Sequence, residues 1–288
     1  MRSHGRRIAW IVLLLQSILL FSCDETPPRV TTSIAEQSFI EISGIRVPVF
    51  VTAAEQFNYT RSWFADIGEK RAALQAFLSL YPDNKRLCGM AALDLAYLQL
   101  GSDYRFAAEQ SSLAAIKEYQ NILHEYGDHP EIQVKAYWYI GWIYAGLLKD
   151  PQKGNEYFYS IVSEYGNEQI SLLPPPPWVS IIHSREEIPQ ASLNSPSAKH
   201  WAALALLEIV RHSEKREEAW SAFAGLWREY RNNAATGFAL QLILEERLHV
   251  DEALVIAQEF VEQKFSNVHI LGDIQREIQT IRSERGDT

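Results

Sequence analysis

Cysteine is the most chemically reactive residue type in this sequence, and the 288-residue chain contains two, Cys23 and Cys88. Cys23 follows a 14-residue run, 8–21, that is apolar apart from Gln16 and Ser17 and has arginines before it. A helix that crosses a bilayer needs about 20 apolar residues. The run therefore predicts a secretory signal peptide over residues 1–22 rather than a membrane span.

The stretch Leu20-Phe21-Ser22-Cys23 resembles the lipobox of bacterial lipoproteins. In that family the cysteine thiol receives a diacylglyceryl group, the signal is cut just before it, and the new amino terminus is often acylated by a fatty acid such as palmitate. The resemblance implies that Cys23 is a lipidation site and that the protein is a lipid-anchored, periplasm-facing lipoprotein of the bacterial cell envelope. The outer membrane is favoured, while Asp24 leaves the inner membrane open. The alternative is an ordinary signal peptide with a chance cysteine.

The other residues that could take part in catalysis or bind a metal do not form a recognisable motif in the sequence. His124 and His129 are five residues apart, whereas a helical zinc site needs histidines at i and i+4. No Gly-rich phosphate loop and no G-x-S-x-G sequence is present. Carboxylate pairs such as Glu217-Glu218 are expected to lie on solvated faces. We therefore expect a protein that is not an enzyme and that has no cofactor and no metal.

Charge and cysteine content exclude several further classes of protein. The chain has a net charge of −9, and removal of the signal peptide with its three arginines leaves −12. Nucleic-acid phosphates require clustered Lys and Arg, so no nucleic-acid partner is expected. If Cys23 carries lipid, Cys88 has no disulfide partner, and it is expected to pack as a small buried hydrophobe.

The chain divides by composition into several segments. Residues 23–38 are polar and contain prolines, which is typical of a tether, and residues 39–51 predict a short β-hairpin or an extended strand. Helical patterns dominate 52–168 and 196–288. They are separated by a proline-rich insertion, 169–195. Helix starts are predicted at Thr52, from capping-box spacing, and at Asp150-Pro151 and Ser195-Pro196.

Four helical stretches repeat one pattern, in which apolar residues are followed by a tyrosine seven positions after the first. A fifth, weaker copy ends at Phe265. The sequence Tyr137-x2-Ile140-Gly141-x2-Tyr144 stands where tetratricopeptide repeats have W-x2-L-G-x2-Y. The four tyrosines are Tyr81, Tyr126, Tyr165 and Tyr230.

The pattern thus resembles tetratricopeptide repeats, in particular the envelope subfamily that includes BamD and the periplasmic partner of the Tol-Pal system. The resemblance covers residues 53–266 and implies an all-α solenoid of helical hairpins. Small or aromatic residues occupy the positions at which paired helices approach closely. Gly141→Leu should therefore destabilise the fold, whereas alanine is expected to be tolerated. These structural repeat residues are Ala96, Gly141, Tyr144, Gly154 and Phe158.

Aromatic residues are the candidates for partner binding. Tyr137, Trp138 and Trp142 belong to a dense aromatic cluster, which indicates either interhelix packing or rings that line a groove. Trp178 follows four prolines in the insertion, which is either a recognition loop or a loop folded over the helices.

The expected function is a lipid-anchored repeat scaffold that binds an envelope protein partner in an assembly or export complex. The alternative is a surface or periplasmic lipoprotein that captures a glycan or peptide ligand.

Overall fold

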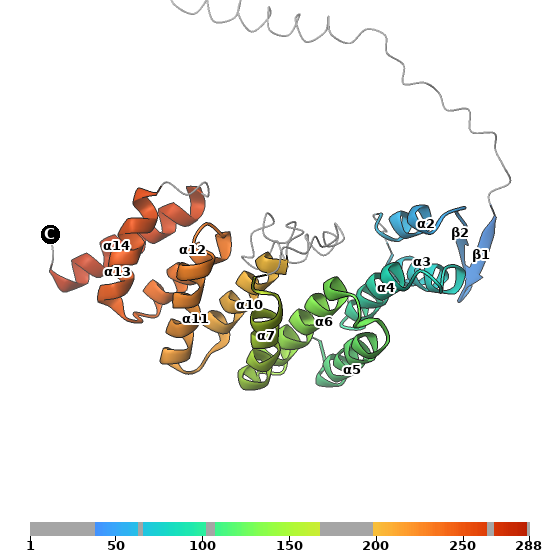
Figure 1. Ribbon diagram of the computed structural model, residues 1–288, viewed down its shortest axis with the longest axis horizontal. Helices are drawn as coiled ribbons and strands as arrows, with labels where there is room; N and C mark the ends of the chain where they lie inside the picture. Colours follow the sequence, from blue (N-terminus) through green and yellow to red (C-terminus); the bar gives the residue numbers. More distant parts are fainter. Residues whose placement is uncertain (1–37, 63–65, 102–106, 168–197, 264–267, 287–288) are drawn as a thin grey trace, which may run out of the picture. The chain divides into compact units, whose positions relative to one another are not determined.

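The computed structural model describes residues 38–62, 66–101, 107–167, 198–263 and 268–286. All of them belong to one compact unit, Ser38–Thr288. The predicted signal peptide with Cys23, the insertion with Trp178, the Ser195-Pro196 start and Phe265 lie outside the described residues, so these predictions stay open. The described part is mostly helical, as the sequence predicts, and begins with a short N-terminal β-hairpin (Figure 1).

The hairpin consists of β1 (Phe39–Ile42) and β2 (Ile45–Pro48), paired antiparallel with Phe39 opposite Pro48. Ser43 and Gly44 form its two-residue turn, with φ of 52° and 80°. Two successive left-handed residues give the turn the twist that neighbouring strands require. The structure thus selects the hairpin from the two alternatives that the sequence left for residues 39–51.

Eleven α-helices and one π-helical segment follow in the described residues. Their bounds are α2 (Ala53–Thr60), α3 (Ile67–Leu80), α4 (Lys85–Leu98), α5 (Glu109–Tyr126), α6 (Pro130–Trp142), η2 (Ile143–Leu147), α7 (Pro151–Tyr165), α10 (Ala198–His212), α11 (Arg216–Glu229), α12 (Ala234–Glu245), α13 (Val250–Glu262) and α14 (Val268–Arg285).

Local side-chain hydrogen bonds set several helix starts. Thr52 and Glu55 form a complete capping box at α2, in which the Glu55 backbone N–H donates to Thr52 Oγ1 at 3.2 Å. Asp150 accepts from the Lys153 backbone N–H at 3.0 Å, and Pro151 occupies the first helical turn of α7. Both predicted starts are confirmed.

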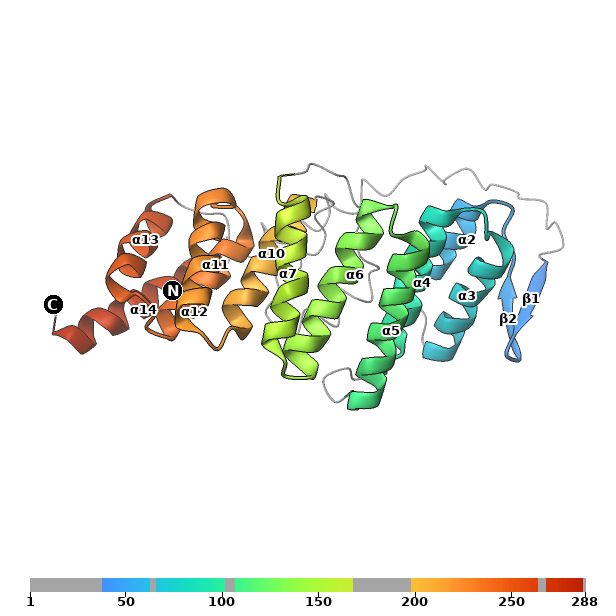
Figure 2. The ribbon, with the colours of Figure 1, turned by 60° about the horizontal axis from the view of Figure 1, so that its bottom comes forward.

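The helices pack in the order in which they follow one another along the chain (Figures 1 and 2). In addition, α4, α6, α10, α12 and α14 each contact the helix before last in that order. Helices α7 and α10, which flank the insertion in sequence, pack directly against each other. One continuous apolar core runs from Phe57 in α2 to Ile281 in α14, and a small second cluster around Val47 and Ala73 joins the hairpin to α3.

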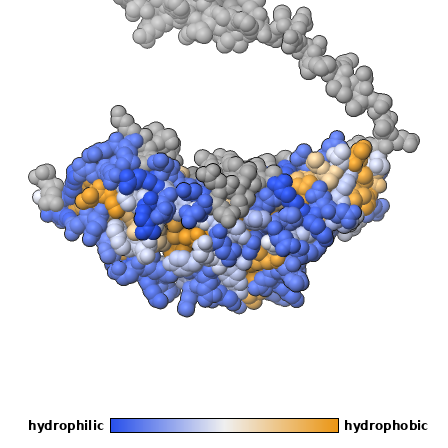
Figure 3. Space-filling model, viewed as in Figure 1, coloured by the Kyte–Doolittle hydropathy of each residue, from blue (hydrophilic) through white to orange (hydrophobic). Residues whose placement is uncertain are grey.

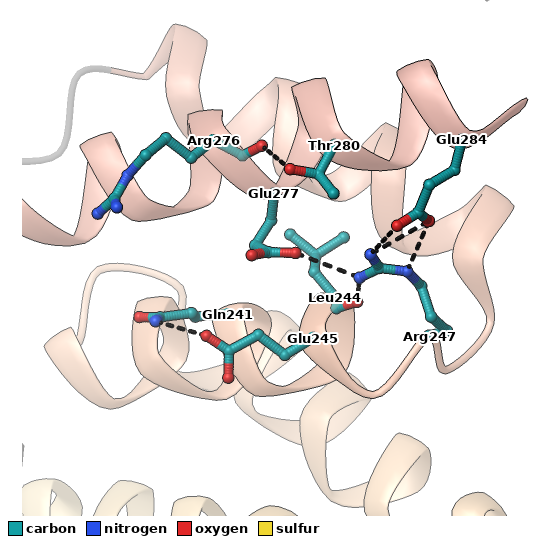
Figure 4. A network of polar contacts seen from close by, with 8 residues as sticks. All are labelled: Gln241, Leu244, Glu245, Arg247, Arg276, Glu277, Thr280 and Glu284. Carbon is teal, nitrogen blue, oxygen red and sulfur yellow. Dashed lines mark hydrogen bonds and ion pairs between the residues drawn. The ribbon is translucent and has the colours of Figure 1, made fainter. Parts of the chain in front are cut away.

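The last helix is held by an arginine hub in the turn between α12 and α13. Arg247 pairs with Glu277 at 3.2 Å and with Glu284 at 3.1 Å, both on α14, and also donates to the Leu244 carbonyl (Figure 4). The Arg247 side chain is 33 % exposed. Its neighbours are exposed too, so this contact lies at the surface and is accessible to dissolved salt.

Candidate functional site

Two of the predicted partner-binding residues are buried. Trp138 on α6 is 1 % exposed and Trp142 is 6 % exposed. Their rings stack at a centroid distance of 6.3 Å, and Trp138 also meets Trp201 of α10 edge-on at 5.6 Å. Both indoles therefore pack between helices. This corrects the prediction that they offer a surface to a partner and selects the alternative of interhelix packing.

Tyr137, one residue before Trp138, points another way and remains partly exposed. Its ring lies 6.1 Å from that of Tyr157 on α7, which in turn stacks on Tyr144 at 6.0 Å. Lys153 lies 4.3 Å above the Tyr144 ring. These three tyrosines form an aromatic row along the contact between α6 and α7, and Tyr137 is the predicted partner residue that keeps accessible surface in the described part of the chain.

Gly141 makes the close helix contact that the sequence predicts. A Cβ atom at this position would lie 3.0 Å from the Gly154 carbonyl oxygen and 2.8 Å from Phe158 Cε1, both on α7. A Cβ at Gly154 would meet the Gly141 carbonyl oxygen at 2.7 Å. The two backbones thus touch directly. The expectation that alanine is tolerated at 141 stays a prediction, and the contact argues against it, because even a methyl group must displace Phe158 or the backbone of α7.

The remaining predicted repeat residues are buried at contacts between helices. Ala96 on α4 is 2 % exposed, Phe158 on α7 is fully buried, and Tyr144 in η2 is 7 % exposed. Cys88 is buried too, and its Sγ lies 3.1 Å from the Tyr81 carbonyl oxygen. Burial raises the pKa of this thiol, which agrees with the expected packing role.

The repeated tyrosines lie at the carboxyl ends of α3, α5, α7 and α11. Three of their hydroxyls donate to an acceptor earlier in the chain. Tyr81 bonds to the Phe50 carbonyl, Tyr165 to Gln133 Oε1 and Tyr230 to the Gly166 carbonyl. The recurring tyrosine therefore joins the end of its own helix to a segment that precedes it.

Sequence reasoning missed a cluster of buried charges beside the aromatic core. Lys70 on α3, Asp94 on α4 and Lys135 on α6 are 4 %, 7 % and 4 % exposed. Asp94 interacts electrostatically with both lysines and with Arg61 at the end of α2. Lys135 Nζ also lies 3.9 Å from Met90 Sδ. This ionic cluster thus draws its charged groups from four helices.

Burial is the largest cause of the pKa shifts of Asp94, Lys70 and Lys135 in the ionic cluster. It raises the pKa of Asp94 to about 6, against the opposing pull of Lys70, Arg61 and Lys135. It lowers the pKa of Lys70 and that of Lys135 to about 8, although Asp94 opposes both shifts. Shifted pKa values in one cluster are typical of functional sites. The ionic cluster is therefore a candidate functional site, with groups that can hold or exchange protons near neutral pH.

The sequence does contain a signal for the ionic cluster. Asp94 interrupts the apolar run "MAALDLAYL", and Lys135 interrupts "IQVKAYWYI". A charge inside such a run is buried unless the helix has an exposed face at that point, and buried charges need partners.

Neither a metal site nor a membrane span is found in the described part of the chain. There, no three His, Cys, Asp or Glu side chains are placed to hold a metal ion. His124 lies at the end of α5 and His129 precedes α6. Among the described helices, none combines the length and apolar character needed to cross a bilayer.

Comparison with known proteins gives no relative for this chain. No protein-family model matches it, no curated protein is similar to it, and no solved structure resembles its fold at a significant level.

Proposed function

We propose that this protein is a lipid-anchored, tetratricopeptide-like scaffold of the bacterial cell envelope that binds a protein partner. The observation that carries the proposal is the backbone contact between Gly141 and Gly154, with Phe158 packed beside it. Tetratricopeptide repeats keep small residues where two paired helices meet, and this chain has glycines at both positions. The lipobox-like sequence at Cys23 supplies the anchor.

The order of helix packing also supports the proposal. In repeat proteins each unit contacts its neighbours, and stacked units provide an extended surface for a partner. Here each helix packs on the next, and a second series of contacts joins alternate helices. We place partner contact at the aromatic row, because Tyr137 combines an aromatic ring with accessible surface.

Capture of a partner from envelope membranes tests the proposal. The full-length protein should retain one partner in stoichiometric amount, and Tyr137→Ala should weaken retention. Leu113→Ala is the matched control, because Leu113 is 47 % exposed on α5 and lies outside the aromatic row. Equal retention by both variants would remove Tyr137 from the interface, and the absence of any stoichiometric partner would refute the scaffold function.

The lipid anchor has its own test. Cells that express the parent or Cys23→Ser are fed labelled fatty acid. The parent should be labelled and membrane-bound, and the variant should carry no label. Equal labelling of both would refute the anchor without affecting the partner proposal.

A second candidate function, the capture of a glycan or peptide ligand, is favoured by the ionic cluster. Burial shifts the pKa of Asp94 and that of Lys135 towards the uncharged forms, as is common at functional sites. A soluble ligand that raises the melting temperature of the parent but not of Asp94→Asn would support it. A ligand that stabilises both proteins equally would place its site elsewhere.

A further inference from the structure

A polar pocket lies where the start of α7 meets the turn between α10 and α11. Its volume is about 320 Å³. The aromatic row and the ionic cluster contribute no residue to it. Its principal polar residues are Asn155, Glu156, Tyr159, Ser213, Glu214 and Glu218.

The side chain of Asn155 has an unsatisfied hydrogen-bond acceptor among the described residues. Its side chain lines the pocket, is 3 % exposed, and donates from Nδ2 to Ser213 Oγ at 3.2 Å. Ser213 Oγ in turn donates to Glu218 Oε2 at 2.7 Å, which fixes the direction of both bonds. Within the described part of the chain, Asn155 Oδ1 is then left without a hydrogen-bond partner and is sheltered from solvent. A buried acceptor without a donor is costly, so a ligand with N–H groups would compensate it.

The excess of negative charge around the pocket favours a positively charged ligand. Glu156, Glu214 and Glu218 line it against one basic residue, Lys215. These carboxylates do not form a metal-binding group by distance in the described part of the chain. A cation that spans acceptors on two helices therefore suits the pocket better than a compact ion, and the guanidinium group does so because it presents five N–H donors in one plane.

Tyr159 adds a surface for stacking. It is 41 % exposed, and its hydroxyl lies 3.5 Å from Glu218 Oε1. Guanidinium planes stack on aromatic rings while their edges bind carboxylates. We propose that this pocket binds the guanidinium group of an arginine side chain presented by a polypeptide. An arginine within a peptide is preferred to the free amino acid, because the three carboxylates would repel the α-carboxylate.

The test uses the full-length protein in detergent and arginine blocked at both ends as an N-acetyl N-methylamide. Titration is followed by the NMR signals of the Asn155 side-chain amide. Saturable shifts are expected with blocked arginine, weaker shifts with free arginine, and none with blocked citrulline, which is neutral. Equal responses to arginine and citrulline, or no saturable shift with arginine, would overturn the proposal. Blocked lysine binding as tightly as arginine would overturn the guanidinium preference.

Two adjacent glutamates on α11 provide a matched pair of variants. Glu218→Gln should raise the dissociation constant roughly three- to tenfold, as loss of a charge-assisted hydrogen bond does. Glu217→Gln removes the same charge, but Glu217 is 83 % exposed and pairs with His249 outside the pocket, so the constant should stay within about twofold. Equal weakening by both would show only a long-range charge effect and overturn the assigned site.

For a third variant, we expect a change in the dissociation constant in the opposite direction. Lys215 is exposed, so Lys215→Gln should leave the fold intact, and loss of the opposing charge should tighten binding. Unchanged or weaker binding would contradict the pocket. The partner-capture experiment addresses Tyr137 on another surface, so either proposal can fail without the other.

Discussion

Two groups of charged residues connect helices at opposite ends of the described chain, and burial makes them differ. In the ionic cluster, Asp94 and Lys135 are almost fully enclosed, and burial moves each pKa towards the uncharged form. In the arginine hub, Arg247, Glu277 and Glu284 are 33 %, 26 % and 55 % exposed, and hydrogen bonds to Glu284 lead in raising the pKa of Arg247. The ionic cluster therefore opposes folding, whereas the arginine hub contributes to it.

This difference indicates which group is retained for stability. Replacement of a complete buried ion pair or network by apolar groups of similar size is often neutral or stabilising, whereas removal of one partner alone is destabilising. A group that costs stability and is nevertheless present is a better candidate for function than one that contributes stability. The comparison thus supports the ionic cluster as a functional site and assigns the arginine hub to the attachment of α14.

The glycine contact between α6 and α7 involves no charged residue at its centre, and its disruption has the largest expected effect. Gly141→Leu should destabilise the domain by about 3 kcal/mol or more, because the side chain must separate the backbones of α6 and α7. The loss should be independent of pH and salt. Urea unfolding of residues 30–288 measures it.

Gly225→Ala on α11 is the control for glycine replacement. Its Cβ would approach Leu206 Cδ1 at an ordinary 3.7 Å, so it should stabilise the domain by about 0.5–1 kcal/mol. A Gly141→Leu midpoint at or above the parent's would reject the close contact between α6 and α7.

Lys135→Met tests whether a buried cation opposes folding. Because the folded pKa of Lys135 is about 8 and its unfolded pKa is 10.5, the unfolded chain binds more protons between these values. The Lys135 contribution to parent stability should therefore rise with pH across this window, by about 3 kcal/mol at most. Lys135→Met should remove its share of the rise. Lys117→Met, at an exposed position on α5, should behave like the parent, and a Lys135→Met protein with the parent's slope would break the comparison.

Asp94→Asn gives a smaller effect in another pH window. The folded pKa of about 6 exceeds the unfolded value of 3.8, so the folded protein binds more protons between these values. Its stability should fall as the pH rises from about 4 to about 6, by roughly 2 kcal/mol. Denaturant midpoints across this range should show the fall in the parent and in the exposed control Asp128→Asn, but not in Asp94→Asn. Stability that rises with pH through Asp94 would place an ordinary salt bridge there.

Arg247→Met should have the smallest effect, a loss of about 1 kcal/mol at low salt. Dissolved salt screens exposed charges, so the difference from the parent should shrink as ionic strength increases. Thermal melts at low and high salt measure this. Arg228→Met is the control, since Arg228 is 76 % exposed and pairs with the adjacent Glu229. A loss that persists at high salt would show that the arginine hub acts through packing instead.

Local sequence information predicted the features whose causes are local. The capping box at Thr52 and the Asp150-Pro151 start depend on neighbouring residues, whereas for residues 39–51 the hairpin was one of two alternatives. The contact at Gly141 was predicted because a glycine within a helix needs a reason. The ionic cluster could not be assembled from sequence, because its members belong to separate helices whose packing must be known first.

The sequence did not predict which aromatic rings of α6 point to the surface, for a related reason. Helix α6 contacts α4, α5, α7 and α10, and nearly all its residues are buried. A helix enclosed on several sides has no polar face from which the inward direction can be read. Trp138 and Trp142 could therefore not be separated from Tyr137 before the neighbours were placed.

The tyrosines at the helix ends make the array directional. Each of the three hydroxyls, from Tyr81, Tyr165 and Tyr230, finds its acceptor on the amino-terminal side. Shortening the chain from its carboxyl end leaves the acceptors of these three hydroxyls in place for as long as the tyrosines themselves remain. Shortening it from the amino end removes an acceptor, and for Tyr230, whose bond to Gly166 is buried, leaves a polar group without a partner. Fragments that keep the beginning of the array should therefore tolerate truncation better than fragments that keep its end.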